Sequence, residues 1–248
     1  MFTVEERLRL RNRLIEAAEH DDRIAGAALT GSEAAGAEDE WSDIDLAFGL
    51  ADGADQAAVL DDWTGRMYGD HDCVAHLDMR VRGTVYRVFL LRNTLQVDIA
   101  FAPAGEFGAL GPTFALLFGE ASEQQPFAEA AAKDLIGMAW LYALHARSSI
   151  ARGKDWQAEY MISGLRDHLL ALMCLRHGVP TSQGRGFHLL PEAITKPVED
   201  TLVRSLDTGE LTRAFRASID VLQPEIEAAD PELARKLAGP LRALATPR

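Results

Sequence analysis

The chain has 248 residues, of which 48% are hydrophobic and 25% charged, and 38 acidic against 25 basic residues give a formal net charge of −13. This composition is typical of a globular protein and excludes a fibre or a disordered chain. The acidic balance argues against a nucleic-acid binder, because Lys and Arg supply most of the affinity for phosphate backbones. The expected partners are therefore small molecules, cations or another protein, with the oligomeric state left open.

No stretch of the sequence approaches the roughly 20 apolar residues that a membrane-spanning helix needs. Residues 1–14 alternate charged and apolar side chains, which is typical of an amphipathic helix and not of a secretory signal. We therefore expect a cytoplasmic protein with no membrane partner. Cys73 and Cys174 have no Cys or His neighbours at zinc-ligand spacing, so both are predicted to be buried free thiols.

The first hundred residues predict a mixed sheet with helices on it. Helical periodicity covers residues 4–18 and 54–68, and short apolar strands are expected at 24–30 and 44–50. Further β-rich segments complete this region, at residues 73–79, 84–92 and 95–101. The last two are separated by Asn93-Thr94 and should form an antiparallel hairpin.

The sequence changes in character after Pro103. Residues 103–126 are rich in glycine and proline and are interpreted as a link between domains, and no convincing strand pattern follows them. The expected helical segments beyond this link are 127–152, 156–177, 197–206, 210–222 and 231–244, with a loop at 181–191. We therefore predict an α+β protein, with an N-terminal mixed-sheet domain at residues 1–110 and an all-α helical bundle at residues 111–248.

A pair of aspartates at the start of the second predicted strand is the first candidate site. Residues 24–65 contain ten carboxylates and no Lys or Arg. Because side chains alternate along a strand, Asp43 and Asp45 should point to one face while Ile44 points into the core. Mg²⁺ prefers one or two carboxylates together with substrate phosphates, so the pair predicts a cation site. The alternative is a solvated acidic face, which is common for such charge-biased runs.

Two further features accompany this pair. Gly31, at the end of the first predicted strand, would let a phosphate approach the backbone, and Ser32 could donate its hydroxyl to it. Asp98 interrupts an otherwise apolar strand, and a buried carboxylate is costly unless it is paired or bound to a metal. Asp98 is therefore either a hydrogen-bonded or edge-exposed aspartate, or the third carboxylate of one site if its strand neighbours that of Asp43 and Asp45.

Residues 24–102 resemble the nucleotidyltransferase fold of the DNA polymerase β superfamily. The resemblance rests on the Gly-Ser pair, the Asp-Ile-Asp string after a gap of ten residues, and Asp98 with its apolar neighbours. With its helical second half, and with the stretch at 153–187, the chain is similar to small antibiotic nucleotidyltransferases that adenylylate aminoglycosides or lincosamides. The resemblance implies Mg²⁺-dependent transfer of a nucleoside monophosphate to a hydroxyl of a small-molecule acceptor between the two domains. The donor would be ATP, which supplies AMP, or another nucleoside triphosphate.

The resemblance also implies a role for each residue of the three strings. Gly31 and Ser32 would hold the β- and γ-phosphates of the nucleoside triphosphate. Asp43 and Asp45 would bind Mg²⁺, and Asp98 would complete the metal site. In several antibiotic-modifying relatives a carboxylate at this third position is the general base, so Asp98 is the first candidate for deprotonating the acceptor.

Residues of the helical half supply the remaining candidates. Kanamycin-modifying relatives place a glutamate base one helical turn before a glycine-lysine pair; here Gly153-Lys154 is present, but Ile150 occupies the glutamate position. Glu159 is the second candidate base, with an ordinary exposed glutamate as the alternative. Arg152 and Lys154 would neutralise the triphosphate, or would simply be helix-end cations that interact with the helix dipole.

A second function is compatible with the same resemblance, namely a nucleotidyltransferase-type antitoxin that binds a partner toxin and adenylylates it. Such proteins are usually shorter and lack so large a helical domain, which favours the small-molecule acceptor. A cationic aminoglycoside would be attracted by the negative surface, whereas a lincosamide would depend more on apolar contacts. Both acceptor classes stay open at this point.

Overall fold

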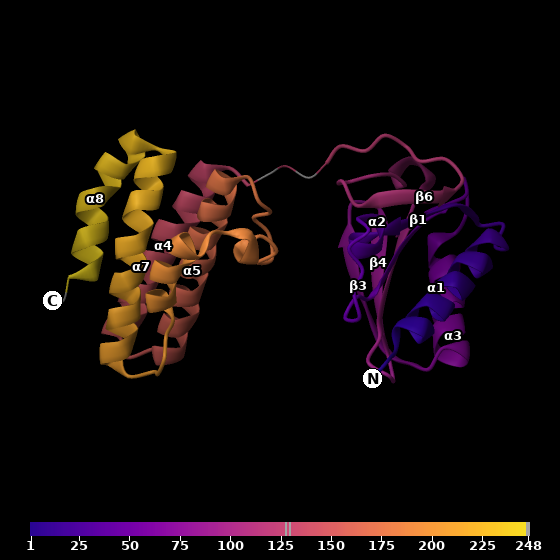
Figure 1. The fold of residues 1–248 in the computed structure, drawn as a ribbon, viewed down its shortest axis with the longest axis horizontal. Helices are drawn as coiled ribbons and strands as arrows, with labels where there is room; N and C mark the ends of the chain where they lie inside the picture. Colours follow the sequence, from indigo (N-terminus) through magenta and orange to yellow (C-terminus); the bar gives the residue numbers. More distant parts are fainter. Residues whose placement is uncertain (127, 129, 247–248) are drawn as a thin grey trace. The chain divides into compact units, whose positions relative to one another are not determined.

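The computed structural model describes residues 1–126, 128 and 130–246. The chain divides into two compact units, residues 1–128 and 129–248 (Figure 1). The elements of the first unit are α1 (Val4–Glu19), β1 (Ile24–Thr30), α2 (Gly31–Ala34), β2 (Ile44–Leu50), α3 (Gln56–Asp70), β3 (Cys73–Val81), β4 (Thr84–Leu91), β5 (Gln96–Ala102), η1 (Ala104–Glu106) and β6 (Phe114–Phe118). Those of the second are α4 (Ala132–Ala151), α5 (Asp155–His177), η2 (Phe187–Leu189), α6 (Glu192–Thr195), η3 (Lys196–Thr201), α7 (Thr208–Ala229) and α8 (Pro231–Ala245).

This arrangement confirms the predicted fold class, a mixed-sheet α+β unit followed by a helical unit. The six-stranded sheet has the strand order β3-β4-β5-β2-β1-β6. Among the described strands the one parallel pair is β2 with β5, and the other neighbouring pairs are antiparallel. β4 and β5 form the predicted hairpin, in which the backbone N–H of Leu91 donates to the carbonyl of Leu95 at 2.9 Å.

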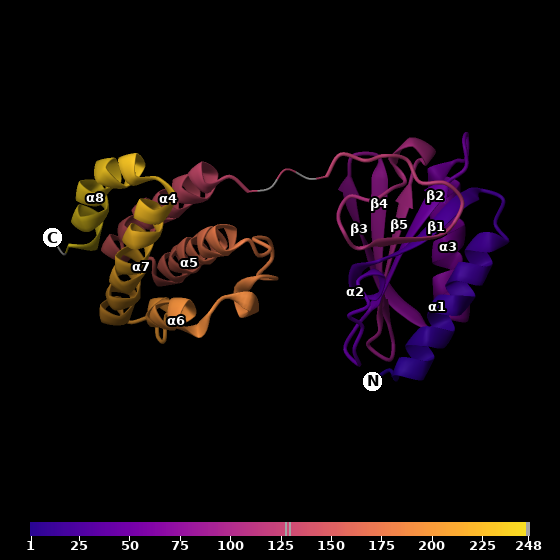
Figure 2. The same cartoon turned by 45° about the horizontal axis from the view of Figure 1, so that its top comes forward.

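One face of the sheet is covered by α1 and α3, as Figure 2 shows. Both helices begin at side-chain caps, with Thr3 accepting from the backbone of Glu6 and Asp55 accepting from the start of α3. The core on this face is centred on Trp63 of α3, whose ring centroid lies 4.8 Å from that of Phe48 on β2. Because side chains alternate along a strand, the residues between these apolar positions point to the opposite face of the sheet.

Small residues line that opposite face. Phe107, in the segment after β5, lies over Gly26 and Gly49, where an added Cβ would overlap its ring. The buried cluster on this face consists of Phe107 and four alanines, Ala28, Ala47, Ala100 and Ala102. No long helix in the described part of the first unit covers this face, and the polar residues of β2 and β5 lie on it, as described below.

Two elements of the first unit differ from the sequence-based expectations. The segment interpreted as a link, residues 103–126, contains the strand β6, which pairs with β1 and extends the sheet. The first unit therefore continues beyond residue 110. The helical turn α2 follows β1 directly, where only a Gly-Ser turn was expected. Its first residue, Gly31, has a φ of +62°, a backbone conformation that glycine adopts without strain.

The second unit is a bundle built around α4, α5, α7 and α8, as predicted. The long helix α5 ends at Gly178, whose φ of +66° closes the helix in the left-handed conformation. The expected helix at 197–206 is instead the short pair α6 and η3, and η2 lies within the expected loop at 181–191. The expected helix start at Phe127 lies outside the described residues.

Two further predictions concern the chain as a whole. Cys73 and Cys174 are buried and free, as predicted. Among the described residues, no helix combines the length and the apolar character that crossing a bilayer requires.

Candidate active site

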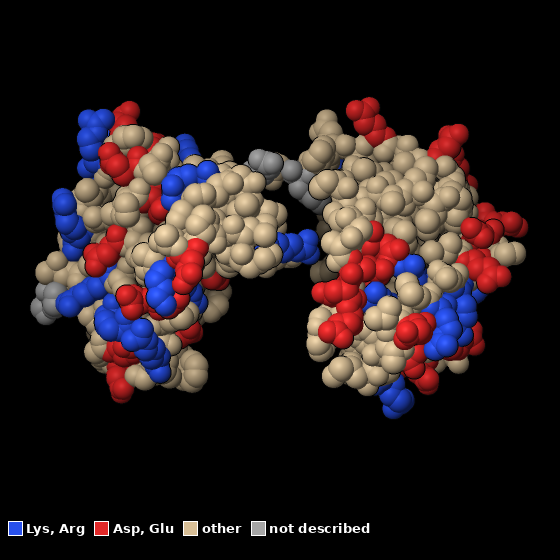
Figure 3. All heavy atoms as spheres, viewed as in Figure 1, with Lys and Arg blue, Asp and Glu red and all other residues tan. Residues whose placement is uncertain are grey.

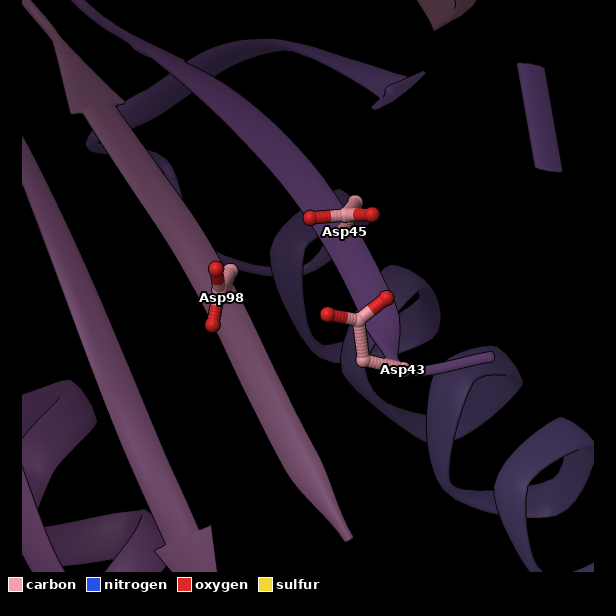
Figure 4. Close-up of side chains that lie close together, drawn as sticks. All are labelled: Asp43, Asp45 and Asp98. Carbon is pink, nitrogen blue, oxygen red and sulfur yellow. The ribbon is translucent and has the colours of Figure 1, made fainter. Parts of the chain in front are cut away.

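Strand pairing brings the three predicted metal-binding aspartates together. β2 and β5 run parallel, and Asp45 lies directly opposite Asp98 in their register. Asp43 precedes β2 and, two residues before Asp45, points to the same face (Figure 4). Their neighbours Ile44 and Val97 are buried in the core under the helices. The alternation predicted from the sequence therefore holds on both strands, and it directs all three carboxylates away from α1 and α3.

The three side chains form one compact carboxylate cluster. One oxygen from each of Asp43, Asp45 and Asp98 lies within 4.8 Å of the other two, and all three residues are half-buried. Three hard oxygen donors at this spacing are the ligand type that Mg²⁺ accepts. Like charges held so close repel each other, and a divalent cation between them would remove that repulsion. The donor set of the described residues therefore fits a divalent cation.

The environment of Asp98 makes it the most perturbed member of the cluster. Burial raises the pKa of Asp98 to about 6, and the negative charge of Asp43 acts in the same direction. The side chain of Gln96 opposes this shift, because its Nε2 donates to Asp98 Oδ1 at 3.0 Å and to Asp43 Oδ2 at 3.2 Å. Gln96 therefore links the two carboxylates. Sequence reasoning missed this role, and the only available signal was the place of Gln96 on the same strand face as Asp98.

The Gly31-Ser32 turn reaches the same end of the sheet. β1 is antiparallel to β2, so the end of β1 lies beside the start of β2. At Gly31 an added Cβ would overlap the carboxylate of Asp45, which shows how closely the turn backbone approaches the cluster. Asp45 is not isolated, since it has an interaction partner in the protein. The turn and the carboxylates are thus neighbours, as the sequence spacing suggested.

The segment between this turn and Asp43 is fastened to α1 by two arginines. Arg7 is only 2% exposed, and its Nη1 donates to the backbone carbonyls of Asp39 at 2.6 Å and Ser42 at 2.9 Å. Arg11 forms ion pairs with Glu33 and Glu38. Within residues 24–65, Glu33 and Glu38 therefore belong neither to a cation site nor to a solvated acidic face, because they pair with arginine.

Sequence reasoning missed these two arginines. The available signal was their spacing of four residues among the leucines of an amphipathic helix, which places both on one side of it. Their acidic partners follow more than twenty residues later, so periodicity alone could not identify the pairing. Figure 3 shows acidic side chains gathered on the first unit next to basic ones.

The remaining predicted site residues belong to the second unit. Arg152 is the C-cap of α4 and Lys154 the N-cap of α5. Glu159 lies on α5, and its Oε1 accepts a hydrogen bond from Ser163 Oγ at 2.6 Å, while Arg166 donates to the same hydroxyl at 3.0 Å. The roles of Arg152, Lys154 and Glu159 stay predictions.

Among known proteins, similarity to this chain is found in solved structures and not in sequence comparisons. No family model matches the sequence, and no curated protein matches it either. Among solved structures, the chain is similar to an aminoglycoside 6-adenyltransferase from Bacillus subtilis, with a TM-score of 0.43 and 12% sequence identity over 100% of both chains. Because this similarity is low, the functional assignment rests on the geometry of the carboxylates.

Proposed function

We propose that this protein is a Mg²⁺-dependent nucleotidyltransferase that transfers AMP from ATP to a hydroxyl of a small-molecule acceptor. The observation that supports this most strongly is the cluster of Asp43, Asp45 and Asp98, whose oxygens lie within 4.8 Å of one another. The neighbouring turn adds to it, because at Gly31 the backbone comes too close to Asp45 for any side chain to fit. Carboxylates facing a turn that lacks a Cβ suit a metal–triphosphate complex.

In this proposal the aspartates hold the metal and the turn holds the triphosphate. Asp43 and Asp45 would be the principal ligands, with Asp98 completing the set. Magnesium, when bound, would neutralise the phosphates and stabilise the attacking and departing oxygens of an in-line displacement at the α-phosphorus. The backbone of Gly31 and the hydroxyl of Ser32 would orient the β- and γ-phosphates, the part that leaves as pyrophosphate.

Asp98 is also the proposed general base. A base works best when its pKa lies near the operating pH, and without a bound cation burial brings the pKa of Asp98 to about 6. At neutral pH most of this carboxyl group is ionised and can accept the proton of the acceptor hydroxyl. The rate should therefore rise with pH through the range in which Asp98 loses its proton, and level off above it.

The helical unit would bind the acceptor and provide further contacts to the phosphates. We propose Glu159 as the alternative base, and Arg152 and Lys154 as cations that neutralise the triphosphate. Aminoglycosides and lincosamides are the acceptor classes to test. The net charge of −13 favours a cationic acceptor, because a negative surface raises the local concentration of cations.

The test is label transfer by the full chain. The protein is incubated with ATP labelled at the α-phosphate, Mg²⁺ and a panel of aminoglycosides and lincosamides, and the products are separated from ATP. We expect a labelled acceptor and free pyrophosphate, and a loss of about a hundredfold or more in rate for Asp43→Ala. Asp61→Asn is the matched control, since it removes an exposed carboxylate of α3 with no hydrogen bond or ion pair in the described chain.

Two results would contradict the proposal. Transfer that survives Asp43→Ala would refute the metal assignment. Label that appears only on a co-purified protein would instead favour the toxin-modifying alternative.

A further inference from the structure

A second pocket of the first unit lies apart from the carboxylate cluster. It has a volume of about 490 Å³ and is formed by α1, the connection from α3 to β3, and the β4–β5 turn. Its apolar part comes from Leu10, Leu91 and Leu95, which belong to the core beneath the helices. The pocket is therefore on the helix-covered side of the sheet, whereas Asp98 points to the other side.

Three arginines line this pocket, which we call the arginine pocket: Arg9 and Arg13 from α1 and Arg92 from the β4–β5 turn. Within the described chain, none of these three guanidinium groups has a hydrogen bond or ion pair. Arg7 and Arg11 of the same helix differ from them, because both form hydrogen bonds or ion pairs with the segment between β1 and β2. Arg7 and Arg11 therefore have a structural role, whereas Arg9 and Arg13 lie at a cavity without partners in the described chain.

The carboxylates at the pocket form no ion pair with these arginines in the described chain. Glu6 lines it, but its carboxylate accepts from the backbone N–H of Thr3 at 2.8 Å in the capping box of α1. Asp70 and Asp72 remain, and neither forms an ion pair with the arginines in the described chain. The lining therefore has three guanidinium groups and three carboxylates that are not paired with one another, and the N–H donors of the arginines are left for a ligand.

The two turns that contribute residues to the pocket each contain a residue with a left-handed backbone. Asp72 has a φ of +53° and Thr94, in the β4–β5 turn, a φ of +72°, a conformation that β-branched residues rarely adopt. The two turns are joined where the backbone N–H of Arg92 donates to the carbonyl of Asp72 at 3.0 Å. This link holds Arg92 beside the α3–β3 connection and hence at the pocket.

A histidine with an unsatisfied ring nitrogen completes the lining. His71 borders the pocket, and its Nδ1 is buried without a hydrogen-bond partner in the described chain. Burial lowers the pKa of His71, and the positive charge of Arg13 lowers it further, which shows that the two side chains lie near each other. Buried polar atoms without a partner are uncommon in folded proteins, and they often mark places where a ligand or water binds.

We propose that the arginine pocket binds the phosphate group of a small phosphorylated molecule, with Arg9, Arg13 and Arg92 donating to its oxygens. Guanidinium groups match phosphate geometry through paired N–H donors, and Arg is the residue suited to such recognition. The three donors come from two elements that converge on one cavity, so a single phosphate can contact both. This site is independent of the proposed nucleotidyl transfer.

Inorganic phosphate is the probe for this site. The full chain, in EDTA and at constant ionic strength maintained with chloride, is titrated with phosphate while the ring resonances of the 7 histidines are recorded. The resonance that disappears in His71→Gln is assigned to His71. We expect it to shift saturably with phosphate, and the binding to weaken by about tenfold in Arg13→Gln and in Arg92→Gln.

The matched control is Arg80→Gln, which removes the same charge from an exposed position on β3 that does not line the pocket. Binding should be unchanged in this control and in Asp43→Ala, which separates the pocket from the proposed metal site. Thermal melting of each variant without phosphate verifies that it folds. Because Arg13 and Arg92 lie on different elements, their variants test the site independently. An unshifted His71 resonance, or equal affinity in Arg13→Gln, Arg92→Gln and the control, would overturn the proposal.

Discussion

Replacing Asp98 by asparagine tests the carboxylate cluster through stability as well as activity. Without a bound cation, the charge of Asp98 is buried beside Asp43, and this raises its pKa from 3.8 to about 6. Between these values the folded protein binds more protons at this position than the unfolded chain does. The free energy of unfolding therefore falls as the pH rises from about 4 to about 6 and is flat above that range.

The size of this effect follows from the pKa difference. A change from 3.8 to about 6 corresponds to at most about 3 kcal/mol, because each pKa unit is worth about 1.4 kcal/mol. The side chain is half-buried, so solvent screening reduces the measured value to about 2 kcal/mol. Asp98→Asn keeps the shape of the side chain and removes the charge. The metal-free variant should thus be more stable than the wild type at pH 8 and equally stable at pH 4.

Hydrogen exchange of peptides that contain β2 and β5 measures this difference, since it reports the first unit separately from the helical one. Added Mg²⁺ should stabilise the wild type more than Asp98→Asn, because a cation that binds only the folded protein adds to its stability and the variant lacks one of the three ligands. Asp61→Asn should show no pH-dependent difference from the wild type. A stability gap between Asp98→Asn and wild type that is the same at pH 4 and pH 8 would refute this electrostatic account.

Three further substitutions test the surrounding structure, each by urea unfolding. Gly31→Ala should cost about 1 to 3 kcal/mol and abolish transfer, because the new Cβ overlaps the carboxylate of Asp45. Its control is Gly36→Ala, at a position with a similar φ of +65° and open space around it. This control should cost only about 1 kcal/mol and keep activity. Arg87→Ala should cost about 3 kcal/mol, since Asp78 loses its bidentate partner and, in the described chain, keeps only a contact of 3.8 Å with Arg80. Arg80→Ala removes only that exposed ion pair and should cost under about 1 kcal/mol. Thr94→Gly should stabilise the protein by about 1 kcal/mol by relieving its left-handed backbone, and a destabilised variant would contradict that interpretation.

Sequence patterns predicted the regular parts of the first unit well. The strands at 24–30 and 44–50 have the predicted bounds, because short apolar runs closed by Gly-Ser and by Ala-Asp-Gly leave little choice of ends. The β4–β5 hairpin followed from Asn93-Thr94. β6 was missed because its five residues lie among glycines and prolines and become a strand only by pairing with β1. Tertiary pairing of this kind leaves no periodic signal in one short segment.

The site was predictable only in part. Alternation along the two strands indicated that Asp43 and Asp45 share a face, but the sequence could not establish that β2 and β5 are neighbours, which decides whether Asp98 joins them. Gln96 and Arg7 act through contacts between segments far apart in the chain, and local patterns do not report such contacts. The arginine pocket depends likewise on three separate segments meeting at one place.

The parallel pairing of β2 with β5 determines where the chain tolerates an inserted or deleted residue. Within the paired strands a change of length alters the register, whereas in a loop between them it does not. One residue inserted in β5 just before Asp98 would turn its carboxylate to the helix-covered side, because successive side chains alternate. A residue inserted beside Gly53, in an open turn with no described atom near its Cβ position, would leave the register untouched. Homologous chains could therefore differ freely in length at that turn while the spacing from Gln96 to Asp98 stays fixed.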